Sequence, residues 1–446
     1  MTVLIRVTHL IRSICALVLL ATSSAGLAET SPTPTETEAK VPHAEAPSRP
    51  RIDQLPLGDP ARLERQAPVV LDAITDTHSG DILDPVELAE RLADVRLLLV
   101  GETHTSDEDH RVQEAVIRAL LDAGRRVVVG LEMMPRERQH SLDAWVDGSL
   151  DEEAMLEVWY QSWGAPWSYY RAIFELARER GLPLRALNVP RSVVRATRMR
   201  PLDELPAAER ALLPPRIEPS SDAHRRLFLA HFEQGDDEDP LHTLDDEMVD
   251  GMVRAQVTWD AAMAWSAVET LRSEPWASDP SAIAVVLAGS GHVVYGLGIE
   301  RQAAPWLDAP IRTLVPVPVE KAGERIESVV GSYADFVWGV ANEPWPRVPP
   351  LGVFTRTIDG RVTILFVDPT SPAVDADLAP GDVLLRADGL PLDSSATLQR
   401  LMAGKHWGES IVLERRRAAG EGDGTEVDGA GEDDTRSVTI RFRRSP

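Results

Sequence analysis

The stretch Arg96-Leu-Leu-Leu-Val-Gly-Glu-Thr-His104 decides the expected fold. An apolar run of this length that stops at a glycine is typical of a buried strand in an α/β sheet. Glu102 and His104 follow the apolar run at once, two residues apart. Because ligands of open α/β sheets bind at the carboxyl ends of the strands, we expect both side chains at a functional site.

Three further apolar runs end in the same manner. They are Arg126–Glu132, Leu182–Asn188 and Ala282–His292, and they finish on Glu132, Asn188 and Gly-Ser-Gly-His292. One polar strand end is ordinary, because strand ends meet water. Four such ends, all able to bind a metal, move a proton or hydrogen-bond, indicate one site at the carboxyl edge of a mainly parallel sheet.

Glu102, His104, Glu132 and His292 together form a set of two imidazoles and two carboxylates. Such a set suits divalent zinc, manganese or iron. It equally suits metal-free proton transfer, in which a histidine acts as base and a glutamate orients it. The residues do not choose between these chemistries. The chain contains no nucleophile elbow, P-loop or dinucleotide fingerprint.

Composition bounds the class of protein. With 446 residues and 43% hydrophobic residues, the chain is long enough for more than one packed domain. Its formal net charge of −25 argues against binding to nucleic acid, which requires a positive surface.

The amino terminus is typical of an exported protein. Arg6 and Arg12 precede the apolar run Ile14–Ala21, and small residues lead to Ala28, so residues 1–28 are interpreted as a cleavable signal peptide. The only cysteine, Cys15, lies inside the apolar run and not at a lipobox. We therefore expect a periplasmic or secreted protein, with residues 29–50 as a disordered tether rich in Pro, Thr and Glu.

Other segments of the first domain carry local signals. We expect a strand at 69–75, a helix at 84–92 capped by Asp84, and a helix capped by Ser106. His110 in that second helix is interpreted equally well as a site residue or as a surface residue. Gln113 and Glu114 are expected at the surface, and His224, His231 and His242 likewise.

Two helical regions bear on the site. The segment from Asp143 to Arg180 holds most of the large aromatic side chains, which we assign mainly to the core, with one or two near Trp167–Tyr170 forming a wall of the site. A long helix at 246–271 has an apolar stripe that Gln256 and Asp260 interrupt. Because a buried carboxylate needs partners, Asp260 is expected to face the histidine and glutamate cluster.

The chain changes character near residue 350. A strand at 362–367, a helix at 394–402 and strands at 410–414 and 438–442 follow in the order that resembles a bacterial PDZ domain. In that family Leu351, Gly352, Val353 and Phe354 would form the loop that binds a peptide carboxylate, and the ligand would add a strand to the sheet edge. We expect a PDZ domain at 350–446, a disordered insertion at 418–434, and a stiff connector at 319–349.

The first domain, expected at 51–318, resembles the ChaN-like domain of the haem-binding-uptake and Tiki superfamily over residues 69–318. The resemblance rests on short motifs in a fixed order: Val100-Gly-Glu-Thr-His104, His110, Leu131-Glu-Met133, Asn188-Val-Pro190, Asp260-Ala-Ala-Met-Ala264 and Gly289-Ser-Gly-His-Val293. It implies an α/β fold whose mainly parallel sheet is flanked by helices. It also implies a central cleft that contains Glu102, His104, Glu132 and His292. Residues 200–245, which are Pro-rich and then acidic, indicate by their composition an inserted helical lid or a mobile excursion.

The resemblance implies haem or iron handling, with a tyrosine as haem ligand in some members. The candidates are Tyr169, Tyr170 and Tyr295, with His110, Asn188 and Asp260 as further cofactor-binding residues. A first hypothesis is thus an exported haem-binding protein whose PDZ module recruits a peptide or protein partner. A second is a hydrolase of peptide or ester bonds, metal-dependent or based on His and Glu. A third is a scaffold in which only the PDZ domain acts, and the intact four-residue set argues against it.

Overall fold

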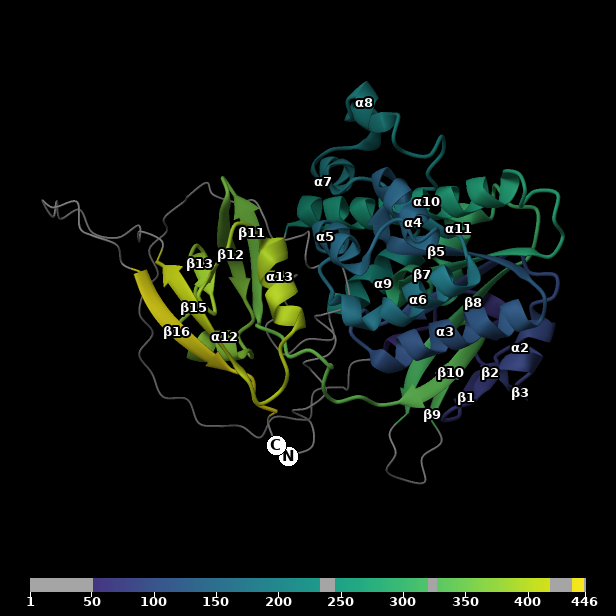
Figure 1. Ribbon diagram of the computed structural model, residues 1–446. Coiled ribbons are helices and arrows are strands. Elements are labelled where there is room, and N and C mark those ends of the chain that lie inside the picture. Colours follow the sequence, from purple (N-terminus) through teal and green to yellow (C-terminus); the bar gives the residue numbers. More distant parts are fainter. Residues whose placement is uncertain (1–50, 233–244, 320–326, 418–434, 445–446) are drawn as a thin grey trace, which may run out of the picture.

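The computed structural model describes residues 51–232, 245–319, 327–417 and 435–444. The expected signal peptide, the tether at 29–50, His242 and the insertion at 418–434 lie outside the described residues. Among the helices of the described ranges, none combines the length and the apolar composition that a membrane span requires. Figure 1 shows an α/β body at the right and a smaller β-rich body at the left.

The α/β body is built on an eight-stranded sheet in the order β3-β2-β10-β8-β4-β7-β5-β6. The pairs joining β10, β8, β4, β7, β5 and β6 are parallel, and β2 and β3 run antiparallel at one edge. The strands are β2 (Ile74–Asp76), β3 (Ile82–Leu83), β4 (Leu97–Glu102), β5 (Arg126–Pro135), β6 (Leu184–Asn188), β7 (Ala282–Gly289), β8 (Ile311–Val319) and β10 (Phe336–Ala341). A separate pair is formed by β1 (Gln66–Val69) and β9 (Glu327–Val330). This confirms the expected fold class.

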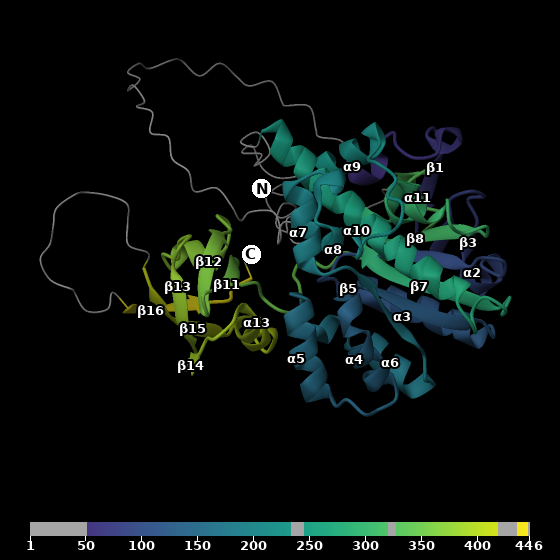
Figure 2. The ribbon, with the colours of Figure 1, turned by 90° about the horizontal axis from the view of Figure 1, so that it is seen from above.

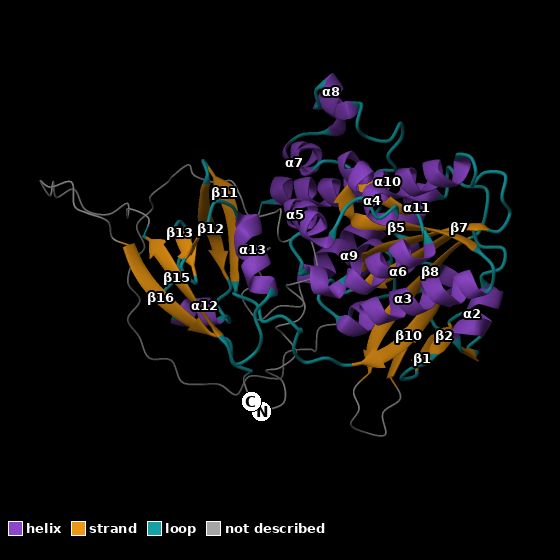
Figure 3. Ribbon diagram, in the orientation of Figure 1, coloured by secondary structure: helices purple, strands orange, loops and turns teal. Residues whose placement is uncertain are grey.

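The central strands are apolar on both faces because helices cover both sides. In β4, Leu98 and Val100 pack into one core, and Leu97 and Leu99 pack into a second core on the opposite face. This alternation follows from the period of two of a β-strand. Figure 2 shows α10 and α9 on one side of the sheet and α3, α4 and α6 on the other, and Figure 3 shows the same layers by secondary structure.

The helices begin where the sequence signals predict. Asp84 accepts from the amides of Val86 and Glu87 and forms a capping box with Glu87, and Ser106 caps the next helix through Asp109 N. The helices of this body are α2 (Pro85–Arg91), α3 (Asp107–Asp122), α4 (Gln139–Val146), α5 (Glu152–Ser162), α6 (Arg171–Arg180), α7 (Arg191–Met199), α8 (Ala207–Arg210), α9 (Asp222–Phe232), α10 (Asp246–Arg272) and α11 (Ile299–Ala303). The expected long helix at 246–271 is α10.

Two local expectations are wrong. The strand expected at 69–75 is divided into the end of β1 and the start of β2, and Asp72 between them has a left-handed φ of 57°. The segment expected as a connector supplies β9 and β10, and β10 lies inside the large sheet between β2 and β8. Trp338 and Val340 of β10 are buried in the core, and this burial stabilises a strand where prolines nearby indicated a linker.

The β-rich body is a sheet in the order β11-β12-β13-β15-β16, with β14 paired to β13. Its elements are β11 (Val353–Ile358), β12 (Arg361–Val367), α12 (Pro372–Asp375), β13 (Val383–Ala387), β14 (Leu390–Pro391), α13 (Ser395–Ala403), β15 (Ser410–Arg416) and β16 (Thr435–Arg441). Leu398 and Met402 of α13 pack with Val362, Ile364 and Ile411 in a core of its own. The order of elements expected for a PDZ domain is confirmed.

Candidate functional site

The register of the parallel strands brings the four strand-end residues together. Glu102 at the end of β4 lies opposite Gly289 at the end of β7, and β7 pairs on its other side with β5, which carries Glu132. The Glu132 carboxylate accepts a hydrogen bond from Gly289 N at 2.7 Å. A Cβ at Gly289 would lie 3.1 Å from His104 Cε1, so the glycine gives the imidazole room to reach the strand end.

Glu102 is a buried carboxylate with several donors. Its Oε1 lies 2.6 Å from His104 Nδ1 and accepts from the Tyr170 hydroxyl at 2.5 Å. Its Oε2 accepts from Gln113 Nε2 at 2.6 Å and lies 3.6 Å from His110 Nε2. These partners replace the water that the carboxylate lost on burial. The helix α3 and the segment before α6 therefore build one half of the site around the end of β4.

The charges of this half are mutually dependent. Burial opposes a charged Glu102, but the charge of His110 and the contacts with His104 and Tyr170 outweigh it and lower the pKa of Glu102 to about 2. Burial likewise opposes a charged His104, but the hydrogen bond to Glu102 and the charge of Glu132 raise the pKa of His104. We therefore assign an ion pair between Glu102 and His104.

The second half of the site is a chain of side chains from α9, α10 and the end of β7. His292 Nδ1 lies 2.6 Å from Asp260 Oδ1 and 3.0 Å from Gln256 Nε2, and His224 Nε2 lies 3.3 Å from Asp260 Oδ2. Burial opposes a charged Asp260, but His292 and His224 hold its pKa below the usual value. The expectation that Asp260 faces the cluster is confirmed in this geometry.

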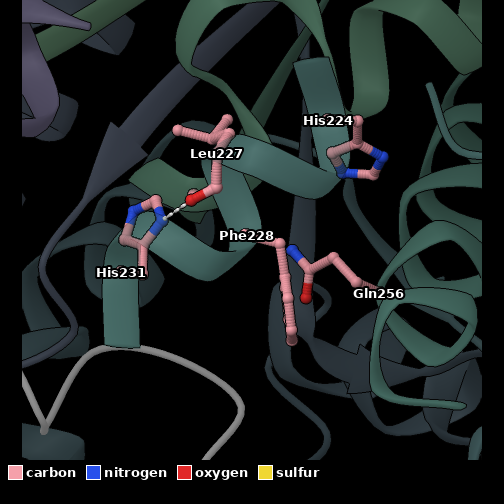
Figure 4. Close-up of a pocket in the computed structure, with 6 residues that line it drawn as sticks. His224, Leu227, Phe228, His231 and Gln256 are labelled. Carbon is pink, nitrogen blue, oxygen red and sulfur yellow. Dashed lines mark hydrogen bonds between the residues drawn. The ribbon is translucent and has the colours of Figure 1, made fainter. Parts of the chain in front are cut away.

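A small cavity of about 10 Å³ adjoins this second half, enough for about one water molecule. It is lined by His224, Leu227, Phe228, His231, Gln256 and Gly291. Figure 4 shows His224 and Gln256 across this space from His231, whose ring bonds to the Leu227 carbonyl. The buried His224 ring forms no hydrogen bond within the described residues.

Glu132 joins the two halves. His292 Nε2 lies 3.6 Å from Glu132 Oε1, and the charges of Glu132 and His292 both act on His104. In His104 and in His292, a carboxylate contacts Nδ1. This contact fixes the orientation of the ring and leaves Nε2 for a ligand or a proton. His104 faces Glu102 through Nδ1, and its side chain is 11% exposed. Within the described part of the chain, no group of three or more His, Cys, Asp or Glu has the arrangement of a metal site.

The other expected site residues are divided between the cluster and other regions. Asn188 donates to the Glu132 carbonyl, which places it at the site. Tyr169 stacks near His110 at 5.7 Å, and its hydroxyl accepts from Val348 N. The Tyr295 hydroxyl donates to Ile52 O and accepts from Leu55 N, and its ring packs on Tyr333 in the core on the other face of the sheet. The structure therefore does not bring Tyr295 to the cluster.

Two residues expected at the surface belong to the site. Gln113 is fully buried against Glu102, and His224 is buried against Asp260. Gln113 follows His110 by three residues, so a helix places both side chains on one face. This spacing is a sequence signal that Gln113 could belong to the same site as His110. For His224 the sequence holds no such signal, because α9 contacts α10 through tertiary packing. Trp163, which we assigned to the aromatic core, contacts His104 edge to face at 5.0 Å.

In the β-rich body, the loop Leu351–Phe354 runs into β11, the edge strand of the sheet. Gly352 has a φ of +81°, and a Cβ there would lie 2.0 Å from Ser371 Cβ. Only glycine fits that close approach. Leu351 is buried in the core of this body, so the loop is anchored at its start.

Comparison with protein families agrees with both bodies. Residues 88–302 match the family described as haem-binding uptake, Tiki superfamily, ChaN, and residues 349–439 match the PDZ domain. The chain carries a ChaN-like haem-binding domain of the Tiki superfamily followed by a PDZ domain.

Individual relatives are distant. Protein RETICULATA-RELATED 5, chloroplastic, of Arabidopsis thaliana is 23% identical over 277 residues, which is 59% of this chain and 36% of that protein. This chain thus spans about a third of the length of that curated relative. A structure of cofacial heme binding to ChaN of Campylobacter jejuni is 19% identical, covers 60% of this chain and 98% of that one, and has a TM-score of 0.44. The HtrA3 PDZ domain bound to a phage-derived ligand is 20% identical, covers 21% and 83%, and has a TM-score of 0.16.

Proposed function

We propose that this protein is an exported haem-binding protein whose PDZ domain recruits a peptide or protein partner. The observation that carries the proposal is the match of residues 88–302 to a haem-binding family, on a domain whose carboxyl sheet edge is rich in imidazole. The periplasm is the proposed compartment, on the strength of the leader sequence.

The residues present fit haem at the outer rim of the cluster. An imidazole nitrogen is a common axial ligand of haem iron, and because Glu102 engages Nδ1 of His104, Nε2 is the nitrogen that would ligate the iron. The phenols fit less well, because a tyrosine ligates iron as phenolate. Burial and Glu102 raise the pKa of Tyr170 well above its usual value, and burial raises the pKa of Tyr169 to about 12. Haem, when bound, would supply iron for storage or transfer.

The test is an absorbance titration of the full mature chain with haemin. We expect a saturable Soret shift, lost in His104→Ala and retained in Tyr295→Phe, which serves as a control because its hydroxyl bonds to Ile52 and Leu55 and not to the cluster. If the shift is lost only in Tyr169→Phe or only in Tyr170→Phe, that tyrosine, and not His104, is the ligand of the haem iron. A wild-type chain that gives no saturable shift would overturn the proposal.

A second candidate function, hydrolysis of a peptide or ester bond, is favoured by the two carboxylate–imidazole pairs. Glu102 orients His104, and Asp260 orients His292, which is the arrangement that a general base requires. Here the test is turnover of a panel of esters and peptides, with and without added divalent metals, compared with His292→Gln. Absence of turnover under all conditions would remove this candidate.

A further inference from the structure

The connection from β10 to the PDZ domain, residues 342–348, lies against the ChaN-like domain. Glu343 Oε2 accepts from Asp107 N at 3.0 Å and from Glu108 N at 3.4 Å, so this carboxylate binds the first turn of α3. Arg347 Nε donates to Asp107 Oδ2 at 3.0 Å and so contacts the same turn. Figure 1 shows the connection in green, running from β10 to the β-rich body. We refer to residues 342–348 as the strap.

The strap covers Tyr169, which in turn covers the His110 side of the cluster. Val348 N donates to the Tyr169 hydroxyl at 3.3 Å, and the Arg347 guanidinium lies 5.8 Å from the centre of the Tyr169 ring. Tyr169 is only 3% exposed, and its ring centre lies 5.7 Å from that of His110. His110 Nε2 lies 3.6 Å from Glu102 Oε2. A continuous series of contacts therefore leads from the strap to the buried carboxylate at the end of β4.

The middle of the strap is held by the PDZ domain. Trp407, which follows α13, packs on Trp345 with ring centres 5.4 Å apart and donates to Pro346 O at 2.7 Å. Pro346 is buried, whereas its neighbours on both sides are more exposed. Leu351, which lies just beyond the strap, packs in the core of the PDZ domain. Because the strap contacts both domains, a movement of one domain relative to the other must break contacts at one side of the strap.

The contacts between the strap and the ChaN-like domain are weaker than those inside the cluster. The side chains of Arg347 and Asp107 are 50% and 28% exposed, and solvent screens an ion pair of this kind. Glu343 lies beside the like charges of Asp107 and Glu108, and burial together with these charges raises its pKa. Both features favour release. The strap can therefore detach at a lower cost in free energy than the breaking of a buried ion pair beneath it.

We propose that the strap is an autoinhibitory contact: docked on α3 and Tyr169, it closes the His110 side of the cluster, and its contact with Trp407 makes that closure depend on the PDZ domain. Release of the strap opens the cluster to a ligand from the side of Tyr169. A partner that moves the PDZ domain away from the strap thereby opens the cluster. The proposal concerns access alone, so it rests neither on haem binding nor on hydrolysis.

The test measures access to His110 in the full mature chain with diethyl pyrocarbonate, which acylates neutral imidazole. Tandem mass spectrometry gives the rate at His110, and hydrogen exchange of residues 342–351 reports whether the strap is docked. Glu343→Ala removes the carboxylate from the amides of α3 and should raise both rates about fivefold. Arg347→Ala should raise both rates about threefold. If the two contacts act independently, the double variant should raise them about fifteenfold.

The matched control is Arg111→Ala, which removes an ion pair from the same turn of α3. Among the described residues, the ion-pair partners of Arg111 are Glu108 and Asp72. We expect this variant to change neither rate. Equal acceleration in Arg111→Ala would mean that loss of any charge beside α3 exposes His110, and the strap would have no special role.

Trp407→Phe tests the dependence on the PDZ domain, because it keeps an aromatic ring beside Trp345 and removes the hydrogen bond to Pro346 O. Both rates should rise about threefold. If they rise in the variants of Glu343 and Arg347 but not in Trp407→Phe, closure does not depend on the PDZ domain and that part of the proposal fails. Faster exchange of the strap in the double variant with an unchanged rate at His110 would overturn the closure itself. Unchanged exchange in the double variant would overturn the docking contacts.

Discussion

The buried cluster of the ChaN-like domain and the open edge of the sheet in the PDZ domain handle charge in opposite ways. In the cluster Glu102 is paired with His104 and Asp260 with His292, and all four side chains are buried. At the open edge of β11 (Val353–Ile358), here called the β11 edge, Arg356 is half-buried, and burial lowers the pKa of its guanidinium. The cluster therefore pairs its charges inside the domain, whereas Arg356 lies at a partly exposed strand edge.

This difference predicts where substitutions act. Removing one member of a buried ion pair leaves the other uncompensated, so it reduces stability strongly. Changing a partly exposed charge at the strand edge leaves stability almost unchanged. The predictions below test that contrast, beginning with the largest effect.

Asp260→Asn should have the largest effect on stability. The carboxylate is fully buried, with His292 Nδ1 at 2.6 Å and His224 Nε2 at 3.3 Å, and an amide there removes the negative charge that faces both rings. We expect the free energy of unfolding of the ChaN-like domain to fall by about 3 kcal/mol or more. Urea unfolding monitored by tryptophan fluorescence measures it. The control is Asp250→Asn, because Asp250 lies on the same helix, α10, and forms an exposed ion pair with Arg225 of α9. An equal loss of stability in Asp250→Asn would abolish the contrast.

Glu102 should make the same domain sensitive to acid. Its pKa is lowered from 4.5 to about 2, so its contribution is present above the unfolded value and is lost as pH falls toward 2. That contribution is of the order of 3 kcal/mol at neutral pH. Glu102→Gln should be less stable at pH 7 and should show a flatter decline between pH 5 and pH 2. If the free energy of unfolding of the variant and of the wild-type chain declined in parallel with pH, Glu102 would not be the group that makes the domain sensitive to acid.

Gly352→Ala tests the loop that leads into the β11 edge. The new Cβ would lie 2.0 Å from Ser371 Cβ at a φ of +81°, so both contact and backbone conformation oppose it. We expect the PDZ domain to lose about 2 kcal/mol. Gly360→Ala is a matched control, because Gly360 has a φ of +71° with no atom within 4 Å of a Cβ. A thermal melt monitored at Trp407 should show a clearly smaller loss of stability for Gly360→Ala than for Gly352→Ala. Equal losses would mean that the contact with Ser371 does not destabilise the domain.

The sequence predicted the backbone of the site better than its surroundings. Apolar runs that stop at a polar residue located Glu102, Glu132, Asn188 and His292, because a buried parallel strand must end where the chain meets the site. Residues supplied by neighbouring helices were harder to place. His110 was ambiguous and Gln113 was misassigned, because helix periodicity gives a face but not the partner it packs against. The contact between His224 and Asp260 depends on tertiary packing alone, which no local pattern encodes.

Arg400→Ala should have the smallest effect on stability. It tests whether charge or apolar packing holds α13 of the PDZ domain against the ChaN-like domain. Arg400 of α13 approaches Glu153 at 3.9 Å and Glu157 at 4.0 Å, and all three side chains are well exposed. Such pairs contribute less than about 0.5 kcal/mol, and salt screens them. The apolar contacts of Ala396 and Ala403 with the ChaN-like core should therefore hold α13 in place. Limited proteolysis of the segment 342–350 should be unchanged in Arg400→Ala and accelerated in Ala403→Glu. Accelerated cleavage in Arg400→Ala would mean that charge, and not apolar packing, joins the two domains.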